Sequence, residues 1–268
     1  MQAPRLVATD VDGTLLAPDD RVSQRAAAVI GRLAAAEVGF VLVTGRPPRW
    51  IPPVAEQVGG VGLVVCANGG VLYDAAADRV VWSCSLGPSA LDELAGLVDD
   101  ALPGSRLAVE RVPAGAADPL PFVAEEGYRH AWAPGVGAVA DRAEVLAAPA
   151  VKLLVRNPDM TSDEMAAVLG PVVGAAADLT YSTRKGLLEL SPPGVTKATG
   201  LAGVAERHGV AAADVVAFGD MPNDLEMLVW AGHGVAMGNA HPALLAVADE
   251  VTASNADDGL ALVLERWF

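Results

Sequence analysis

Three short polar segments of the chain follow directly after apolar, β-branched runs. Asp10-Val11-Asp12-Gly13-Thr14 follows the run 6–9, Thr44-Gly45-Arg46 follows 40–43, and Gly-Asp-Met-Pro-Asn-Asp at 219–224 follows 215–218. In an open parallel sheet the carboxyl ends of the strands form one crevice, where ligands bind. We therefore expect the three segments to converge at one edge of a sheet.

Such a crevice would gather carboxylates, hydroxyl groups and the free backbone N–H groups beside glycines. Carboxylates that are crowded together repel one another unless a cation lies between them, and ligands that are all oxygen favour a hard metal such as Mg²⁺. Bound Mg²⁺ usually keeps several waters and shares its coordination shell with a substrate phosphate. The residue types therefore predict phosphoryl chemistry at a Mg²⁺ site.

Each segment taken alone has a structural alternative. The Asp-x-Asp-Gly pattern at 10–13 is often a turn, Thr44-Gly45-Arg46 could cap a following helix, and 219–224 could be a loop with an N-cap. Three polar segments at the ends of three strands are hard to explain as independent turns. Their coincidence favours the functional interpretation.

In their order along the chain, these segments resemble the motifs of haloacid dehalogenase (HAD) superfamily phosphatases, in the Cof-type branch with a large C2B-like cap. The first motif is 10–15, the second Thr44-Gly45-Arg46, the third Lys197 within 194–197, and the fourth 219–224. Further similarity runs through Asn68-Gly69-Gly70, 235–240 and 248–252. The resemblance covers both ends of the chain nearly completely and the middle only loosely.

The resemblance implies a mechanism for the carboxylates. Asp10 would be the nucleophile that attacks phosphorus and becomes an aspartyl phosphate, which splits one hard displacement into two steps. Asp12 would protonate the leaving oxygen and later deprotonate the hydrolytic water. Mg²⁺ would be held by Asp10, the backbone carbonyl of Asp12, and Asp220.

The resemblance also implies a set of phosphate-binding groups, some from side chains and some from the backbone: Val11, Thr44, Gly45, Lys197 and Asn223. Arg46, Asn68 and Asp224 would support them, and Asp224 would orient either Lys197 or the metal shell. Lys197 precedes an Ala-rich helical stretch. A lysine at a helix start is normally a solvated surface residue, whereas the N–H groups at that end attract anions.

Short β-branched runs alternate with Ala-rich helical stretches at both ends of the chain, which predicts an α/β fold built around a parallel sheet. With the resemblance, this becomes a doubly wound, Rossmann-like HAD core. Ser23 is the predicted N-cap of a helix that ends before Gly39. The middle mixes Pro/Gly loops with isolated strand-like runs and helices. We therefore predict a discontinuous core of residues 1–81 and 188–268, with an α+β cap at 82–187.

Composition limits the partners of the protein. The formal net charge is -15, and only three of the 18 basic residues are lysines, which argues against nucleic acid or an anionic membrane as a partner. No apolar stretch reaches the ~18 residues of a membrane span, and no signal peptide is recognisable, so a cytoplasmic location is expected. Cys66 and Cys84 form no CxxC pair and are interpreted as packing residues.

The sequence thus predicts a Mg²⁺-dependent phosphatase acting on a small phosphorylated metabolite, of open oligomeric state. Two alternatives remain: a phosphomutase or phosphotransferase acting on a sugar phosphate, and a non-enzymatic phospho-acceptor module. The cap would close over the site and provide side chains that recognise the substrate. Its polar and aromatic candidates are Glu125, Tyr128, Arg129, His130, Trp132 and Arg184.

Overall fold

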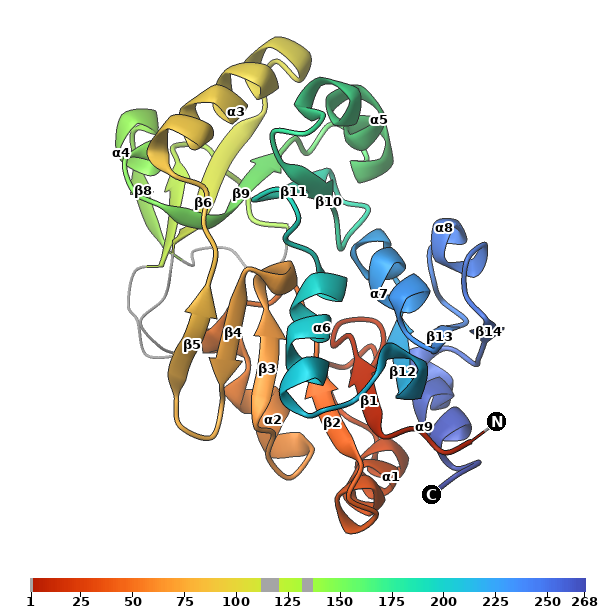
Figure 1. Cartoon of the computed structure of the whole chain (residues 1–268). Helices are drawn as coiled ribbons and strands as arrows, with labels where there is room; N and C mark the ends of the chain where they lie inside the picture. The colour runs from red at the N-terminus through yellow and green to blue at the C-terminus, as the bar shows by residue number, and fades with distance from the viewer. Residues whose placement is uncertain (1, 112–120, 132–136) are drawn as a thin grey trace. The chain divides into compact units, whose positions relative to one another are not determined.

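The structure, a computed structural model, describes residues 2–111, 121–131 and 137–268 (Figure 1). The chain divides into two compact units, one formed by Met1–Val81 with Thr196–Phe268 and the other by Trp82–Val195. The first is the core unit and the second the inserted unit.

The core unit is built on a parallel five-stranded sheet with the strand order β14-β13-β12-β1-β2. Its strands are all short: β1 (Leu6–Thr9), β2 (Gly39–Leu42), β12 (Val215–Gly219), β13 (His233–Ala236) and β14 (Glu250–Val251). Because β1 lies between β12 and β2, the segments that follow these three strands emerge side by side. This arrangement places the predicted polar segments at one sheet edge.

A second sheet of three strands continues the core unit beyond β2. It consists of β3 (Leu63–Cys66), β4 (Val71–Asp74) and β5 (Arg79–Ser83), in that order. A parallel bridge between Val43 and Val65 joins the two sheets, and the Thr44 N–H donates to the Val65 carbonyl at 2.8 Å. The end of β3 therefore lies beside the end of β2.

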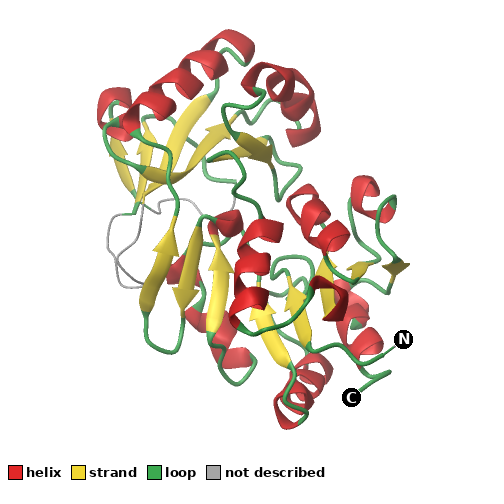
Figure 2. Ribbon diagram, in the orientation of Figure 1, coloured by secondary structure: helices red, strands yellow, loops and turns green. Residues whose placement is uncertain are grey.

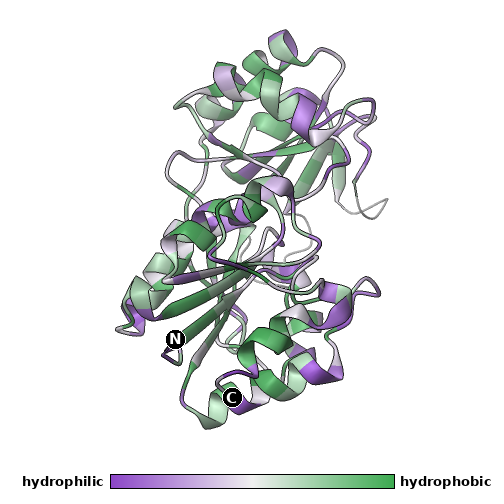
Figure 3. Ribbon diagram, turned by 90° about the vertical axis from the view of Figure 1, so that its right-hand side faces the viewer, coloured by the Kyte–Doolittle hydropathy of each residue, from purple (hydrophilic) through white to green (hydrophobic). Residues whose placement is uncertain are grey.

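Helices cover both faces of the core sheet, and the apolar strands lie between them (Figures 1 and 3). They are α1 (Gln24–Ala35), α2 (Pro52–Gln57), α6 (Lys197–Arg207), α7 (Leu225–Trp230), α8 (Pro242–Leu245) and α9 (Gly259–Leu264). One buried cluster joins Leu201 of α6 and Met227 of α7 to Ala8 and Ala217 of the sheet. The doubly wound α/β fold is as predicted.

Helix α1 shows how local sequence sets these boundaries. Ser23 accepts a hydrogen bond from the Ala26 N–H, which confirms the predicted N-cap. The helix ends at Ala35, before Gly39 as predicted, but Gly39 already belongs to β2 and Glu37 adopts the left-handed conformation, at φ 56°. A non-glycine residue makes the turn that a glycine was expected to make.

The inserted unit is an α+β structure with a six-stranded sheet in the order β10-β11-β9-β6-β7-β8. Its strands are β6 (Arg106–Arg111), β7 (Phe122–Glu125), β8 (Ala138–Ala140), β9 (Ala150–Arg156), β10 (Asp178–Thr180) and β11 (Leu187–Ser191). Its helices α3 (Pro88–Ala101), α4 (Arg142–Leu146) and α5 (Ser162–Val173) gather on one face of that sheet (Figure 2). In none of the described parts of the chain is a helix both long enough and apolar enough to cross a membrane.

The second boundary of the inserted unit differs from the prediction. We expected the core to resume at residue 188, because the alternation of strand-like and helical runs resumes at Leu187. The run from Leu187 is β11, which pairs antiparallel with β9 in the sheet of the inserted unit, so the unit extends to Val195. A short apolar run predicts a buried strand, but its pattern does not identify the sheet that the strand joins.

Candidate active site

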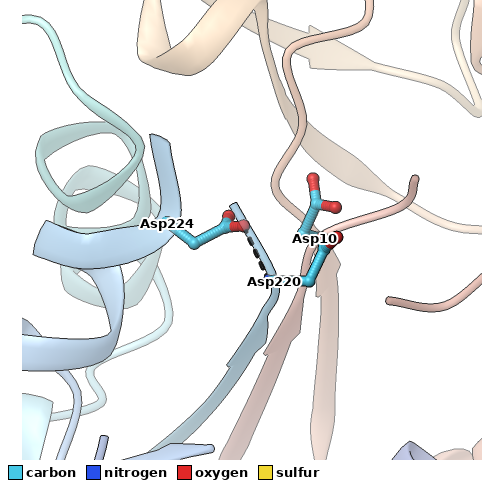
Figure 4. A group of neighbouring side chains, drawn as sticks. All are labelled: Asp10, Asp220 and Asp224. Carbon is cyan, nitrogen blue, oxygen red and sulfur yellow. Dashed lines mark hydrogen bonds between the residues drawn. The ribbon is translucent and has the colours of Figure 1, made fainter. Parts of the chain in front are cut away.

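Three aspartates from two strand ends meet at the carboxyl edge of the core sheet. Asp10 follows β1, and Asp220 and Asp224 follow β12, its neighbour in the sheet. One carboxylate oxygen from each residue lies within 4.8 Å of the others, and all three residues are buried (Figure 4). Two of the predicted segments therefore converge.

Lys197 is the cation of this cluster. As the first residue of α6 it is only 1% exposed, and its Nζ donates to Oδ1 of Asp10 at 2.5 Å and to Oδ1 of Asp224 at 2.6 Å. Burial alone would lower the pKa of Lys197, but the two carboxylates outweigh it and the net direction is upward. The alternative of a solvated surface lysine is wrong.

Two of the three carboxyl groups of the cluster, those of Asp10 and Asp220, have raised pKa values. Burial, partly offset by Lys197 and reinforced by Asp224 and Asp12, raises the pKa of Asp10 from 3.8 to about 7. Burial, together with Asp10 and Asp224, raises that of Asp220 to about 8. One ammonium group does not balance the charge of three buried carboxylates, so the site suits a further cation.

Two of the three aspartates are better suited than the third to hold that cation. Oδ2 of Asp224 accepts from the backbone N–H of Asp220 at 3.0 Å (Figure 4). The same Oδ2 accepts from the Met221 N–H at 3.1 Å, and Oδ1 of Asp224 accepts from Lys197. Oδ1 of Asp220 accepts from the Thr14 hydroxyl at 3.0 Å. Because both oxygens of Asp224 are already engaged, Asp10 and Asp220 are the candidate ligands. An all-oxygen donor set of this kind fits Mg²⁺.

The carboxylate of Asp12 lies outside this group. Arg46 donates to it from Nε at 2.8 Å and from Nη2 at 2.6 Å, in a bidentate ion pair, and the Asp12 side chain is 45% exposed. The Arg46 N–H also donates to the Thr44 hydroxyl at 3.0 Å. The first and second motifs are therefore joined by an ion pair that neither motif alone predicts.

The predicted phosphate-binding groups lie together beside the aspartates. The carbonyl of buried Thr44 accepts from the Asn68 N–H at 3.0 Å, and Nδ2 of Asn223 donates to Oδ1 of Asn68 at 3.2 Å. A Cβ atom at Gly45 would lie 3.0 Å from that same Oδ1, so glycine lets the Asn68 side chain approach its backbone closely. Oδ1 of Asn223 is buried without a hydrogen-bond partner among the described residues. Such an unsatisfied acceptor marks a place where a ligand can donate.

The turn after β3 is strained. Ala67, Asn68 and Gly69 have φ values of 52°, 55° and 103°. A Cβ atom at Gly69 would lie 2.1 Å from the Thr196 carbonyl oxygen, so the turn sits directly against the start of α6. Non-glycine residues in this conformation cost of order 1–3 kcal/mol each and cluster at functional sites. The turn places Gly69 against Thr196, the residue that precedes Lys197.

Three polar residues near the site were not singled out by the sequence analysis: Thr14, Asn239 and Asn255. Thr14 lies within the first motif, and its hydroxyl binds Asp220. Asn239 lies in the recognised segment 235–240, which carried no assigned role. Asn255 follows β14, a strand of two residues that is too short to give a sequence pattern.

The candidates of the inserted unit have structural contacts of their own. Glu125 forms an ion pair with Arg142 and accepts from the Leu107 N–H at 2.8 Å, so it stabilises that unit. The rings of Tyr128 and His130 pack with each other at 5.3 Å between centroids. Two backbone carbonyls also accept hydrogen bonds: that of Arg129 from the Arg156 side chain, and that of Arg184 from the Ser162 N–H. Trp132 lies outside the described residues.

Comparison with known proteins identifies the class. A family model described as haloacid dehalogenase-like hydrolase matches residues 7–264, and the chain belongs to this family, in its Cof-type branch. A 5-amino-6-(5-phospho-D-ribitylamino)uracil phosphatase of Bacillus subtilis (strain 168) is 30% identical, covering 99% of this chain and 98% of the relative.

Further relatives agree with this class. An HMP-PP phosphatase of Serratia proteamaculans (strain 568) is 29% identical, covering 98% of this chain and 95% of that protein. Among solved structures, a haloacid dehalogenase-like hydrolase from B. subtilis shares the fold, with a TM-score of 0.81 at 22% identity, covering 98% of this chain and 100% of that one. The chain is a hydrolase of the phosphatase type.

Proposed function

We propose that this protein is a Mg²⁺-dependent phosphatase that hydrolyses a small phosphomonoester through an aspartyl phosphate on Asp10. The observation that carries the proposal is the buried group of Asp10, Asp220 and Lys197 beside Thr44 and Asn223. It combines a nucleophile, a site for a hard cation and donors for a phosphate. The names of the two curated relatives support a small phosphorylated metabolite as the substrate.

The reaction then has two displacements at phosphorus. In the first, a carboxylate oxygen of Asp10 attacks phosphorus, the bond to the ester oxygen breaks, and Asp12 gives a proton to the departing alcohol. In the second, water attacks the phosphorus of the aspartyl phosphate and gives a proton to Asp12. The bond to Asp10 breaks and inorganic phosphate leaves.

The chain's own groups position the reactants. Lys197 holds Oδ1 of Asp10 and neutralises part of the charge that accumulates on the phosphoryl oxygens. Thr44, the backbone of Gly45 and Val11, and Asn223 would bind these oxygens. When bound by Asp10, Asp220 and the Asp12 carbonyl, Mg²⁺ supplies positive charge that reduces the repulsion between nucleophile and phosphate.

Asp12 must change its contacts during this cycle. Both of its carboxylate oxygens accept hydrogen bonds from Arg46. To give a proton to a leaving oxygen, the Asp12 carboxyl group must turn toward that oxygen, whereas the bidentate pair holds it toward the guanidinium. We therefore propose that Arg46 holds Asp12 between turnovers and that substrate binding loosens the pair.

A panel of phosphomonoesters tests the function. Sugar phosphates, nucleotides, flavin mononucleotide, pyridoxal phosphate and polyol phosphates are incubated with the protein in Mg²⁺ or in EDTA, and inorganic phosphate is measured. We expect release from at least one substrate with Mg²⁺, loss of release in EDTA, and recovery when Mg²⁺ is returned. Full activity in EDTA, or no release from any substrate, would contradict the proposal.

The same assay separates the two alternatives. Isomerised sugar phosphate that depends on an added bisphosphate activator, without free phosphate, would indicate a phosphomutase. A long-lived aspartyl phosphate without turnover would indicate a phospho-acceptor module. The cytoplasmic location expected from the sequence stays a prediction, which fractionation of the source cells would test.

A further inference from the structure

Segment 235–240, part of the family resemblance, lies near the loop 13–16 that follows Asp10 and Asp12. The proposed chemistry gives this segment no role. After β13, the Met237 N–H donates to the Gly219 carbonyl at 3.0 Å, and the Gly238 N–H donates to the Ala253 carbonyl at 3.0 Å. A Cβ atom at Gly238 would lie 2.9 Å from the Ser254 nitrogen. Glycine at this position therefore lets the segment after β14 pass close by.

This close passage brings two asparagines together. The backbone N–H of Asn255 donates to Oδ1 of Asn239 at 2.9 Å. Nδ2 of Asn239 donates to the Gly13 carbonyl at 2.9 Å, and Nδ2 of Asn255 donates to the Leu16 carbonyl at 2.8 Å. The pair thus holds the loop 13–16 at both of its ends.

The loop held in this way contacts a candidate metal ligand. Gly13 has φ +80°, and a Cβ atom there would lie 2.3 Å from Oδ2 of Asp220. The hydroxyl of Thr14, the next residue, donates to Oδ1 of the same carboxylate at 3.0 Å. The Asp12 carbonyl belongs to the peptide directly before Gly13. Movement of this loop would therefore displace two of the groups that are expected to hold Mg²⁺.

We propose that Asn239 and Asn255 are positioning residues for the Mg²⁺ site. They fix the Gly13 and Leu16 carbonyls and so keep the Asp12 carbonyl and Asp220 in the arrangement that binds the ion. The inference rests on the proposed function, since it assumes that this site holds Mg²⁺. Loss of groups that orient metal ligands typically lowers metal affinity by about 10–100-fold.

The test compares three variants with the unsubstituted protein after removal of metal. Asn239→Ala removes the donor to Gly13 and the acceptor for Asn255, whereas Asn255→Ala removes only the donor to Leu16. Thr252→Val is the matched control, because the Thr252 hydroxyl donates to the Gly259 carbonyl at 2.8 Å in the same part of the chain without reaching the loop. Mg²⁺ binding is measured by isothermal titration calorimetry, and the melting temperature of each variant is recorded.

We expect Asn239→Ala to raise the dissociation constant for Mg²⁺ by about tenfold or more. Asn255→Ala should have a smaller effect in the same direction, and Thr252→Val should bind Mg²⁺ as the unsubstituted protein does. At saturating Mg²⁺, the asparagine variants should recover most of the kcat measured with p-nitrophenyl phosphate. A purely structural role would lower the melting temperature without the combination of weaker Mg²⁺ binding and a recovered kcat.

Two results would overturn the inference while leaving the proposed function intact. One is unchanged Mg²⁺ affinity in both asparagine variants, and the other is an equal loss of affinity in Thr252→Val. If Asn239→Ala does not fold, Asn255→Ala decides between the outcomes. Failure of the unsubstituted protein to bind Mg²⁺ would instead contradict the proposed function, and the inference with it.

Discussion

A single residue, Lys197, sets the balance of charge in the site. It is one of only three lysines in a chain of net charge -15, yet it is buried between Asp10 and Asp224. Removing one partner of a buried ion pair is costly, because the other charge stays buried without a partner. The acidic composition is therefore compatible with an anionic substrate, since the compensating charge is local.

Replacing Lys197 should reveal how strongly it is coupled to Asp224. We expect Lys197→Met to lower the free energy of unfolding by about 3–5 kcal/mol, since Asp10 and Asp224 would remain buried without their cation. The double variant Lys197→Met/Asp224→Asn should lose less than the sum of the two single losses, with a coupling energy above about 1 kcal/mol. Urea unfolding in EDTA measures both quantities.

Lys185→Met provides the control, because the Lys185 side chain is exposed. Its effect should stay within about 0.5 kcal/mol. Strict additivity of the Lys197 and Asp224 substitutions would contradict the described pair.

The sequence predicts that the polar segments converge, but it predicts few of the contacts that their residues make. Residues after strand ends converge because parallel strands end at one edge, so Asp10, Thr44 and Asp220 could be predicted together. The bidentate pair of Asp12 with Arg46 spans two motifs, and its geometry depends on how their loops close. Pattern and spacing do not contain that information.

The position of Lys197 depends on how closely helix α6 packs against strand β3. A Cβ atom at Gly200 in this helix would lie 2.5 Å from Cγ1 of Val65 and 3.0 Å from Cα of Gly69, whereas one at Gly203 would meet nothing within 4 Å. The two glycines of one helix thus play different roles. Gly200 is required by a close approach, and Gly203 is not.

This difference predicts opposite effects of the same substitution. Gly203→Ala should stabilise the protein by about 0.4–1 kcal/mol, because alanine restricts the unfolded chain and suits a helix. Gly200→Ala should destabilise it by about 1–3 kcal/mol through overpacking, and should lower kcat because α6 carries Lys197. Chemical denaturation and phosphate release measure the two effects. Equal stability changes in both variants would contradict the packing of α6 against β3.

Elements were predictable where local signals and burial coincide. The Ser23 cap and the apolar face of α1 follow from sequence alone, as does β1. The assignment of the run from Leu187 to the core failed because pairing with β9 is a long-range choice among sheets. Glu37 in a left-handed turn likewise has no sequence signal as strong as a glycine.

The raised pKa values of Asp10 and Asp220 make the stability of the whole protein depend on pH. Both rise from 3.8, to about 7 and about 8. The folded protein therefore binds more protons than the unfolded chain between about pH 4 and pH 8, so stability falls as pH rises through this window. Lys197, whose pKa is also raised, affects stability only at more alkaline pH.

We therefore expect the metal-free protein to have a higher melting temperature at about pH 6 than at about pH 8. Mg²⁺ should raise the melting temperature most at about pH 8, because it replaces the protons that the carboxylates have lost. Thermal denaturation with EDTA or Mg²⁺ across this range measures both effects. A metal-free melting temperature that increases from pH 6 to pH 8 would contradict the described cluster.

The proposed function depends on Asp10 carrying the phosphoryl group during turnover. Acid quenching of the reaction during steady turnover, followed by mass spectrometry of the peptide that contains residue 10, tests it most directly. We predict that a fraction of this peptide gains the mass of one phosphoryl group. The Asp10→Asn substitution should abolish both this adduct and phosphate release. Substantial phosphate release by the folded Asp10→Asn protein, or a phosphoryl adduct on another residue, would contradict the account.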